Sequence, residues 1–299
     1  MEVRGIWDFS NVPSAPTLSC PPLPTMIPML YHSAARMRAP SVSAVALSLF
    51  EVVEKKNGVV RFSTREELLE YFKLNEDTTV VLSGTDIDNS LERWWGLEDR
   101  EAVIRGIKQL GVCFITAPNY SLFDDVPRHD NLYNMKRIAL AFSEIQRHGV
   151  PCGLHLNART DRDWERWLEF LYAHPEISHV AFEFGTGAGN KTRIGWYVHK
   201  LVTLAASLDR PLHLVARGGL SEISKLANVF DGLTIIETNA FMRAQKRRRG
   251  VMTDGKLSWT KSPTAPGKPL DDLLDANIAA LRSYVNQSLP LIKPKQTVN

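Results

Sequence analysis

The sequence predicts a (β/α)8 barrel of the TIM type, and three observations support this fold class. Short apolar runs rich in β-branched residues alternate with longer amphipathic patterns of helical period along most of the chain. Such alternation is typical of a parallel sheet whose strands are joined by covering helices. Eight such runs can be counted, and a chain of 299 residues suits an eight-stranded barrel.

The predicted strands are apolar, β-rich runs bounded by polar or glycine residues. Six are clear: Val80–Ser83, Val112–Ala117, Cys152–Leu156, His179–Phe184, Leu212–Ala216 and Leu233–Glu237. Two further candidate strands lie nearer the start of the chain, at Met26–Tyr31 and Val45–Phe50. Together they give the eight strands of the predicted barrel.

Helical patterns separate these strands. Asn131–His148 carries apolar residues at the i, i+3, i+4 spacing of an amphipathic helix, and Asp161–Ala173 repeats the pattern with Thr160 or Asp161 as the N-cap. Ile194–Leu208 and Ser221–Val229 behave alike. An open, doubly wound sheet is the structural alternative, but no glycine fingerprint of the dinucleotide-binding type follows the first strand, so we favour the barrel.

The two ends of the chain differ from the region between them. Six prolines crowd residues 11–28, and proline fixes φ and lacks a backbone donor. We therefore expect an extended Pro-rich arm over residues 1–25, a single barrel domain over 26–289 and a flexible tail over 290–299.

Composition and charge exclude several classes of protein. The 36 Lys and Arg residues against 33 Asp and Glu give a net charge of +3, which decides neither for nor against a nucleic-acid partner. The three cysteines are scattered, so they predict no disulfide framework and no zinc site. There is no secretory signal pattern, and no stretch approaches the roughly 20 apolar residues of a membrane span. We expect a cytoplasmic protein with no membrane association, no metal and no cofactor.

Polar side chains stand at or just after almost every predicted strand end. In a barrel these ends meet on one face, where the chemistry of the fold is placed. The candidate residues are Asp86, Asp88, Asn119, Tyr120, His155, Asn157, Glu183, Arg217 and Glu237.

Each of these residues also has a structural reading. Asp86 or Asp88 could cap the following helix, and His155 could be a hydrogen-bonded core histidine. Glu183 between two phenylalanines and Glu237 after two isoleucines are harder to explain in this way, because a buried carboxylate is costly unless it is hydrogen-bonded or functional. We regard Glu237 as the stronger of the two.

A basic run follows the last predicted strand. Lys246, Arg247, Arg248 and Arg249 are consecutive, and Arg243 precedes them. A charge run is often only a solvated surface, but this one begins a few residues after a strand end, where four cations would suit phosphate contacts. Arg128 adds positive charge in another loop of the same predicted face.

The order of these motifs resembles the queuine and archaeosine tRNA-guanine transglycosylase superfamily. The resemblance rests on Pro211–Gly219, on Asp231–Arg243 with the strand that ends in Glu237, on Arg249-Gly250 and on Thr253–Gly255. Leu82–Asp86 matches the strand end that bears the family's second catalytic aspartate. Val126–His129 and the residues after it look closer to the DNA-modifying branch, which inserts 7-deazaguanines into DNA.

The resemblance implies a pentosyltransferase that exchanges guanine for a 7-deazaguanine base in nucleic acid, DNA rather than tRNA. Glu237 would stabilise or trap the positively charged sugar, as carboxylates do in retaining glycosidases. Asp86 or Asp88 would protonate the departing base and deprotonate the incoming one. The base would be read by Asn119, Tyr120, His155, Asn157, Glu183 and Arg217. The phosphates would be held by Arg243, Lys246, Arg247, Arg248, Arg249 and Arg128.

The chain also departs from the family. The family nucleophile is Asp where this chain has Glu237, the glycine motif after the second aspartate is missing, and no cysteine follows Cys152 to form the family's zinc cluster. Two other functions therefore stay open. One is a non-catalytic barrel that binds a deazaguanine or nucleic acid for partner proteins of a modification or defence system. The other is a metal-dependent hydrolase or lyase using His155, His213, Asp86 and Glu183.

Overall fold

The computed structural model describes residues 8–54, 58–186, 189, 192–265 and 267–290. The predicted arm is therefore described from residue 8 onward. Of the predicted tail, only residue 290 is described, and residues 291–299 lie outside the described part of the chain.

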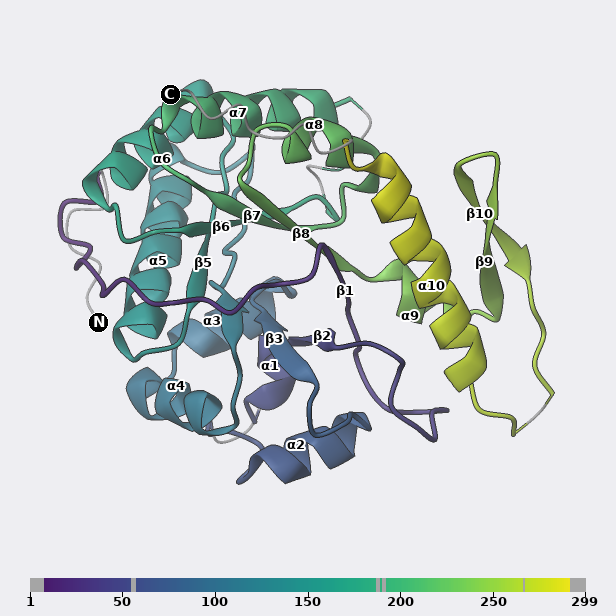
Figure 1. Ribbon diagram of the computed structural model, residues 1–299. Helices are drawn as coiled ribbons and strands as arrows, with labels where there is room; N and C mark the ends of the chain where they lie inside the picture. Colours follow the sequence, from purple (N-terminus) through teal and green to yellow (C-terminus); the bar gives the residue numbers. More distant parts are fainter. Residues whose placement is uncertain (1–7, 55–57, 187–188, 190–191, 266, 291–299) are drawn as a thin grey trace, which may run out of the picture.

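Eight parallel strands form the predicted barrel (Figure 1). They are β1 Met26–Pro28, β2 Ala44–Ser48, β3 Thr79–Ser83, β4 Phe114–Thr116, β5 Cys152–His155, β6 His179–Glu183, β7 His213–Arg217 and β8 Gly232–Glu237. Neighbouring strands in the chain are neighbours in the sheet, and β1 pairs with β8. A parallel bridge between Met29 and Ala46 joins β1 to β2 and closes the ring. Each of the eight predicted strands overlaps one of these, so the barrel is confirmed and the open sheet is not.

Helices cover the outside of the barrel and extend it after β8. They are α1 Leu49–Val52, α2 Arg65–Phe72, α3 Asp88–Trp95, α4 Arg100–Gln109, α5 Arg128–Arg147, α6 Asp161–Ala173, α7 Ile194–Ser207, η2 Leu220–Glu222, α8 Ile223–Ala227, α9 Asn239–Gln245 and α10 Asp271–Ser288. The predicted start of α6 is confirmed: the Thr160 side chain accepts from Asp163 N, and the Asp163 side chain completes a capping box.

The alternation of side chains along the strands separates two apolar regions. One small cluster fills the barrel: Ile27, Met29, Ala44, Ala46, Val81, Phe114, Val215 and Ile236. The residues between them in the strands, such as Val45 and Ile235, belong to the large cluster between strands and helices. Glu183, Arg217 and Ile236 stand side by side in the register, so Glu183 and Arg217 face inward. Glu237 follows Ile236 and therefore faces outward.

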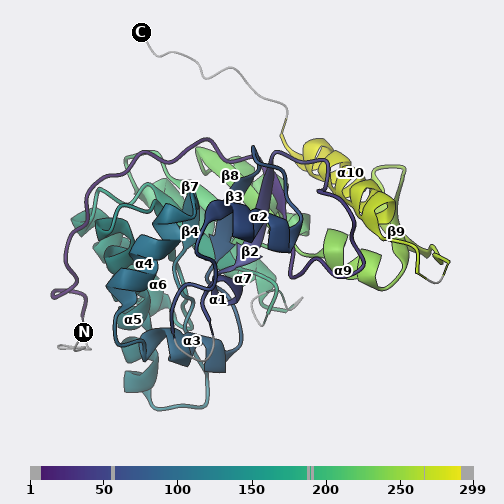
Figure 2. The ribbon, with the colours of Figure 1, turned by 90° about the horizontal axis from the view of Figure 1, so that it is seen from below.

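The Pro-rich arm crosses one end of the barrel (Figures 1 and 2). Cys20 and Leu23 pack against the interior cluster, and Phe9 stacks on Trp167 of α6 with ring centroids 4.8 Å apart. Ser143 Oγ of α5 donates to the carbonyl of Pro13 at 2.6 Å. Extended backbone without its own sheet partners is thus held by side chains of the helices.

An extension follows β8. After α9 come two antiparallel strands, β9 Arg248–Thr253 and β10 Lys256–Lys261, and then α10. Figure 1 shows α10 between the barrel and this hairpin. Among the described helices, none is both long enough and apolar enough to cross a membrane.

Candidate active site at the barrel mouth

Six polar side chains face inward at the carboxyl ends of β2 to β7. Following the alternation of each strand, they are Ser48, Ser83, Thr116, His155, Glu183 and Arg217. Beneath them lies the apolar interior cluster, and His179, His213 and Thr234 face inward nearer the opposite end. This ring is the mouth of the barrel, the position where barrel enzymes carry their chemistry.

Arg217 connects three sides of the mouth. Its Nη1 donates to the carbonyl of Thr85 at 3.2 Å, and its Nη2 donates to Tyr31 Oη at 3.2 Å. Nη1 also lies 3.4 Å from Glu183 Oε2. One guanidinium therefore holds the segments after β1 and β3 against β6, and it places a positive charge in the mouth.

Glu183 is the carboxylate of the mouth. Its side chain is 4% exposed, and burial raises its pKa above the ordinary value, while Arg217 and the Gly185 amide act in the opposite direction. The Gly185 amide donates to Oε1, whereas Oε2 accepts no hydrogen bond from any described residue. A buried carboxylate oxygen that lies beside a cation and accepts no hydrogen bond is the kind of group that active sites maintain.

A cavity of about 250 Å³ opens at the mouth beside β3 to β6. Four of the residues predicted to form the site line it: Asp86, Asn119, Asn157 and Glu183. The other lining residues are Thr85, Ser121, Leu122, Phe123, Leu156, Arg159, Phe182, Thr186 and Tyr197. Carboxylates, amides and hydroxyls thus share one small space with aromatic and aliphatic walls, as is common in sites for small organic molecules.

The two asparagines of the cavity are tied to each other. Asn157 Nδ2 donates to Asn119 Oδ1 at 3.1 Å and to the carbonyl of Tyr120 at 3.0 Å. Asn119 Nδ2 and Asn157 Oδ1 make no hydrogen bond with the described residues. The pair therefore offers one donor and one acceptor to a bound molecule.

Asp86 and Asp88 differ in their surroundings. Asp86 is exposed at the mouth; its Oδ2 accepts from Ser48 Oγ at 3.3 Å and its Oδ1 from Ile87 N at 2.7 Å. Asp88 is the first residue of α3 and accepts from Ser121 Oγ at 2.6 Å. Only Asp86 lines the cavity, so the structure distinguishes two carboxylates that the sequence left equivalent.

His155 lies in the mouth as a buried, uncharged group. Its Nδ1 is 2.7 Å from the carbonyl of Ala117, and its Nε2 is 3.5 Å from Thr85 Oγ1. Burial lowers the pKa of His155 to about 4. A neutral ring that donates through Nδ1 leaves Nε2 as an acceptor, so His155 orients Thr85 at the edge of the cavity.

Tyr120 and Glu237 lie outside the cavity. Tyr120 is buried in the helix layer, where its ring lies 3.8 Å beneath the Arg137 guanidinium and contacts Trp95 edge-on. Glu237 is 1% exposed and faces away from the barrel interior. Its Oε1 accepts from the backbone and side-chain nitrogens of Asn239 at 2.6 and 2.7 Å. Burial raises the pKa of Glu237, and its Oε2 accepts no hydrogen bond from a described residue.

The basic residues predicted to bind phosphates are spread over several elements. Arg243 lies on α9 and Lys246 ends it, Arg247 follows, and Arg248 and Arg249 begin β9. The Arg243 guanidinium lies 5.4 Å from the ring of Trp259 on β10. Arg128 begins α5 and forms an ion pair with buried Asp163 of α6, so its charge is largely compensated inside the protein.

The side chains proposed for the metal-dependent alternative do not meet. His213 begins β7 and lies at the opposite end of that strand from Arg217, about 13 Å away at the rise of a β-strand. It stacks on His179 and bonds Thr234 Oγ1 at 2.9 Å. Among the residues that the structure describes, no three His, Cys, Asp or Glu side chains are grouped to hold a metal ion.

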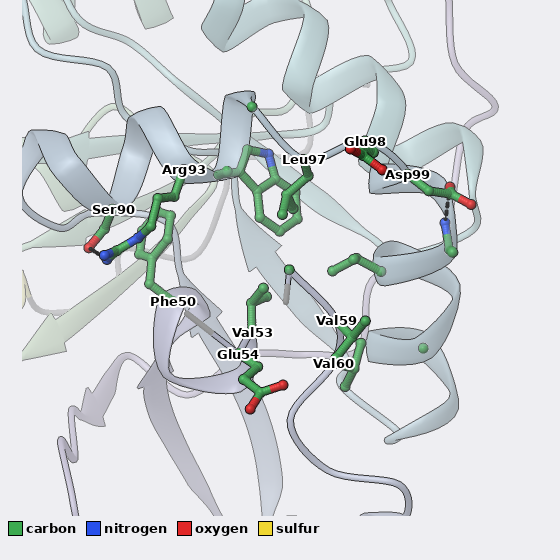
Figure 3. A pocket seen from close by; sticks show the side chains of 16 residues that line it. Phe50, Val53, Glu54, Val59, Val60, Ser90, Arg93, Leu97, Glu98 and Asp99 are labelled. Atoms are coloured by element: carbon green, nitrogen blue, oxygen red, sulfur yellow. Dashed lines mark hydrogen bonds between the residues drawn. The ribbon is translucent and has the colours of Figure 1, made fainter. Parts of the chain in front are cut away.

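A second, larger cavity of about 720 Å³ lies beside α3 and α4, away from the predicted site residues. Figure 3 shows Val53, Val59, Val60 and Leu97 converging on it from the segment after α1 and from the end of α3. None of the residues predicted to carry the function lines this cavity.

Arg159 and Tyr197 are cavity residues that the sequence analysis did not select. Arg159 Nη1 donates to Tyr197 Oη at 3.2 Å, and its Nε donates to the carbonyl of Leu122 at 2.7 Å. Arg159 carried a signal, because it follows a strand end by only a few residues. Tyr197 belongs to the apolar stripe of α7 and gave no such signal.

Comparison with known proteins adds little beyond the fold. No protein-family model matches the chain, and no curated protein does. One solved structure that matches is described as "a putative phosphonomutase from Burkholderia cenocepacia J2315". It is 15% identical, with a TM-score of 0.39, over 75% of this chain and 90% of that chain. A similarity at this level carries no functional argument.

Proposed function

We propose that the protein is a transglycosylase that exchanges guanine for a 7-deazaguanine base in nucleic acid, with DNA as the favoured acceptor. The observation that carries this proposal is the cavity at the mouth, which combines two carboxylates, two amides and aromatic walls in about 250 Å³. The resemblance in the order of motifs implies the same reaction class, with Glu237 in the place of the nucleophile.

The cavity suits a flat, hydrogen-bonding base. Phe123, Phe182 and Tyr197 supply apolar and aromatic surface for a ring system. Asn119 offers a donor and Asn157 an acceptor, and the two side chains are in contact in the cavity wall. They complement a 6-oxopurine, which presents a carbonyl oxygen next to a ring N–H. A flipped-out nucleotide could place such a base in this cavity.

Glu183 and Asp86 fit the two chemical roles. Glu183 Oε2 would attack the anomeric carbon as the glycosidic bond breaks, and the electron pair of the glycosidic bond would leave with the base. Asp86 would donate the proton that neutralises the departing base and would then take the proton of the incoming one. Attack by the incoming nitrogen would release Glu183 and restore both carboxyl groups.

This assignment moves the nucleophile from Glu237 to Glu183. Both carboxylates end a strand, both are buried and burial raises the pKa of both. Glu183 faces the barrel interior and lines the cavity, whereas Glu237 faces outward and is held by Asn239. Glu237→Gln is therefore the matched control for Glu183→Gln.

The experiment incubates the protein with nucleic acid and isotope-labelled 7-deazaguanine and then measures nucleosides by mass spectrometry. We expect incorporation by the wild type, a loss of about a thousandfold or more in Glu183→Gln and Asp86→Asn, and little change in Glu237→Gln. Full activity in the first two variants would remove the assignment. Loss in Glu237→Gln alone would return the role to Glu237. Base binding without turnover in the wild type would favour the non-catalytic barrel.

A further inference from the structure

The β9–β10 hairpin has an unusual concentration of positive charge. From residue 243 to residue 261 it and the end of α9 carry seven cations and one carboxylate, Asp254. The whole chain has a net charge of only +3. Within the described part of the chain, no ion pair joins any of these seven cations to a carboxylate, although many other Arg residues, such as Arg100 and Arg162, are paired. The charge of the hairpin is therefore available to an external anion.

The register divides the hairpin into two faces. Gly250 N donates to Asn277 Oδ1 of α10 at 2.8 Å, and a Cβ on Gly250 would lie 3.1 Å from Ala280 Cβ of α10, so the face that contains Gly250, Arg248 and Trp259 lies against α10. The opposite face carries Arg249, Val251, Thr253, Lys256, Ser258 and Thr260. All of these except Val251 are exposed. The outward face therefore contains two cations, three hydroxyl side chains and no carboxylate.

The hairpin is firmly anchored to the rest of the molecule. Asn277 is fully buried and also donates through Nδ2 to the carbonyls of Arg248 and Ala240, at 2.9 and 3.3 Å. The Arg243 guanidinium covers Trp259 from α9. A ribbon held in this way presents its outward face as a rigid surface beyond α10 (Figure 1).

We propose that this outward face of β9–β10 lies in the major groove of duplex DNA. Arg249 and the row of Lys256 and Thr253 are four residues apart along the ribbon, about 14 Å at the rise of a β-strand. The major groove of B-form DNA is about 12 Å wide and admits a two-stranded ribbon. Arg249 and Lys256 can thus reach phosphates on both sides, while Ser258 lies in the row between them and can face the base edges; Thr260 and Thr253 stand directly opposite the two cations.

Two other partners fit this face less well. A protein interface or a membrane surface needs apolar or aromatic anchors, and Val251 is the one apolar side chain on the outward face. The major groove of A-form RNA is deep and narrow, so side chains do not read it. The inference rests on the nucleic-acid substrate of the proposed function and adds the form of that substrate and the surface that binds it.

The test measures binding of a fluorescent 24-base-pair DNA duplex by anisotropy over a range of salt concentrations. The double variant Arg249→Ala/Lys256→Ala is compared with Arg105→Ala/Lys108→Ala, which removes two exposed cations from α4, an element far from the hairpin in Figure 1. We expect the hairpin variant to bind at least tenfold more weakly at 0.1 M salt. Its plot of log affinity against log salt should be less steep by about two. The α4 variant should match the wild type.

Three outcomes would overturn the inference: no duplex binding by the wild type, equal losses in the two double variants, or tighter binding of the same sequence as a single strand. Glu183→Gln separates this inference from the proposed function, because it should bind DNA as the wild type does. Duplex binding through the hairpin without base exchange in any assay would refute the proposed reaction and leave the hairpin surface intact. Thermal melts of both double variants establish that they are folded.

Discussion

At the scale of the residue, Arg217 sets the electrostatics of the mouth. It lies 3.4 Å from Glu183 Oε2, and its charge opposes the rise that burial causes in the pKa of Glu183. It also bonds the carbonyl of Thr85 and the hydroxyl of Tyr31. Its contribution can therefore be electrostatic, acting on Glu183, or positional, acting on the cavity wall.

A pH profile separates these two contributions. In Arg217→Met the opposing charge is removed, so the pKa of Glu183 should rise further. Because the proposed nucleophile must be ionised, the exchange rate of the variant should begin to fall at a higher pH than that of the wild type when the pH is lowered. The acidic limb of kcat against pH measures this shift. Arg217→Lys keeps the charge and should restore most of the limb. An unchanged limb in Arg217→Met would show that the arginine acts only on position.

The limits of sequence reasoning are clearest for Glu183 and Glu237. The sequence places both at strand ends, which is correct, and its pattern predicts that both are costly to bury. It does not reveal which one faces the barrel interior. A strand buried on both sides is apolar at every position, so its sequence has no alternation of apolar and polar residues to show which side chains point inward. The direction of Tyr120 depends on the loop after β4, which turns its ring toward Arg137 and the helix layer, and a strand pattern does not describe that loop. Only the register between strands supplies the missing direction.

At the scale of the element, prediction succeeded where the signal is local. All eight strands and the capped start of α6 follow from runs of β-branched residues and from cap chemistry within a few positions. The two faces of the β9–β10 hairpin were not predicted, since a run of basic residues gives no direction until Gly250 is seen against α10. The same holds for the floor of the barrel, where two histidines from adjacent strands stack.

These two histidines should make stability depend on pH. His179 and His213 have ring centroids 4.8 Å apart, and burial lowers the pKa of each from 6.5 to about 4. The unfolded chain therefore binds protons that the folded chain does not, and this difference opens as the pH falls below 6.5. The free energy of unfolding is therefore highest above pH 6.5 and falls progressively as the pH is lowered toward 4.

Urea unfolding at pH 7.0, 6.0 and 5.0 measures this loss. We expect the free energy of unfolding to fall by about 1–2 kcal/mol per buried histidine between pH 7 and pH 5, a window in which ordinary carboxylates barely titrate. His155, whose pKa is also lowered to about 4, should contribute in the same direction. The double variant His179→Asn/His213→Asn should flatten the pH dependence. The exposed His129, changed to Asn, should not, and an equal flattening there would contradict the assignment to the stacked pair.

At the scale of the whole molecule, the barrel separates stability from chemistry. The mouth gathers polar groups that are incompletely paired, such as Glu183 Oε2, whereas the opposite end is covered by the Pro-rich arm. Packing of the arm stabilises the fold at one end and so offsets the cost of burying charged groups at the other end. The arm should therefore contribute to the folding of the barrel without taking part in the reaction.

Removing residues 1–16 tests this division of roles. The deletion takes away the Phe9 ring on Trp167, the buried Val12, the Pro13 carbonyl bonded by Ser143 and the Pro16 carbonyl bonded by Gln146. Burial of Phe9 and Val12 stabilises the fold by roughly 2 kcal/mol each, and the entropy of ordering the arm offsets part of that gain. We expect a net loss of about 2 kcal/mol in urea unfolding, with a single cooperative transition retained.

The same truncated protein should still bind duplex DNA through the β9–β10 hairpin and exchange bases at an unchanged rate per folded molecule. The arm contacts α5, α6 and the interior cluster, none of which supplies a residue to the hairpin or to the lining of the cavity. Deletion of residues 291–299, the tail predicted from the sequence, is the control at the other terminus and should leave stability as it is. A truncated arm that kept full stability would show that the prolines, which already restrict the unfolded chain, contribute nothing by docking. A loss of exchange with stability preserved would mean that the two ends of the barrel are coupled, and would place the arm within the catalytic unit.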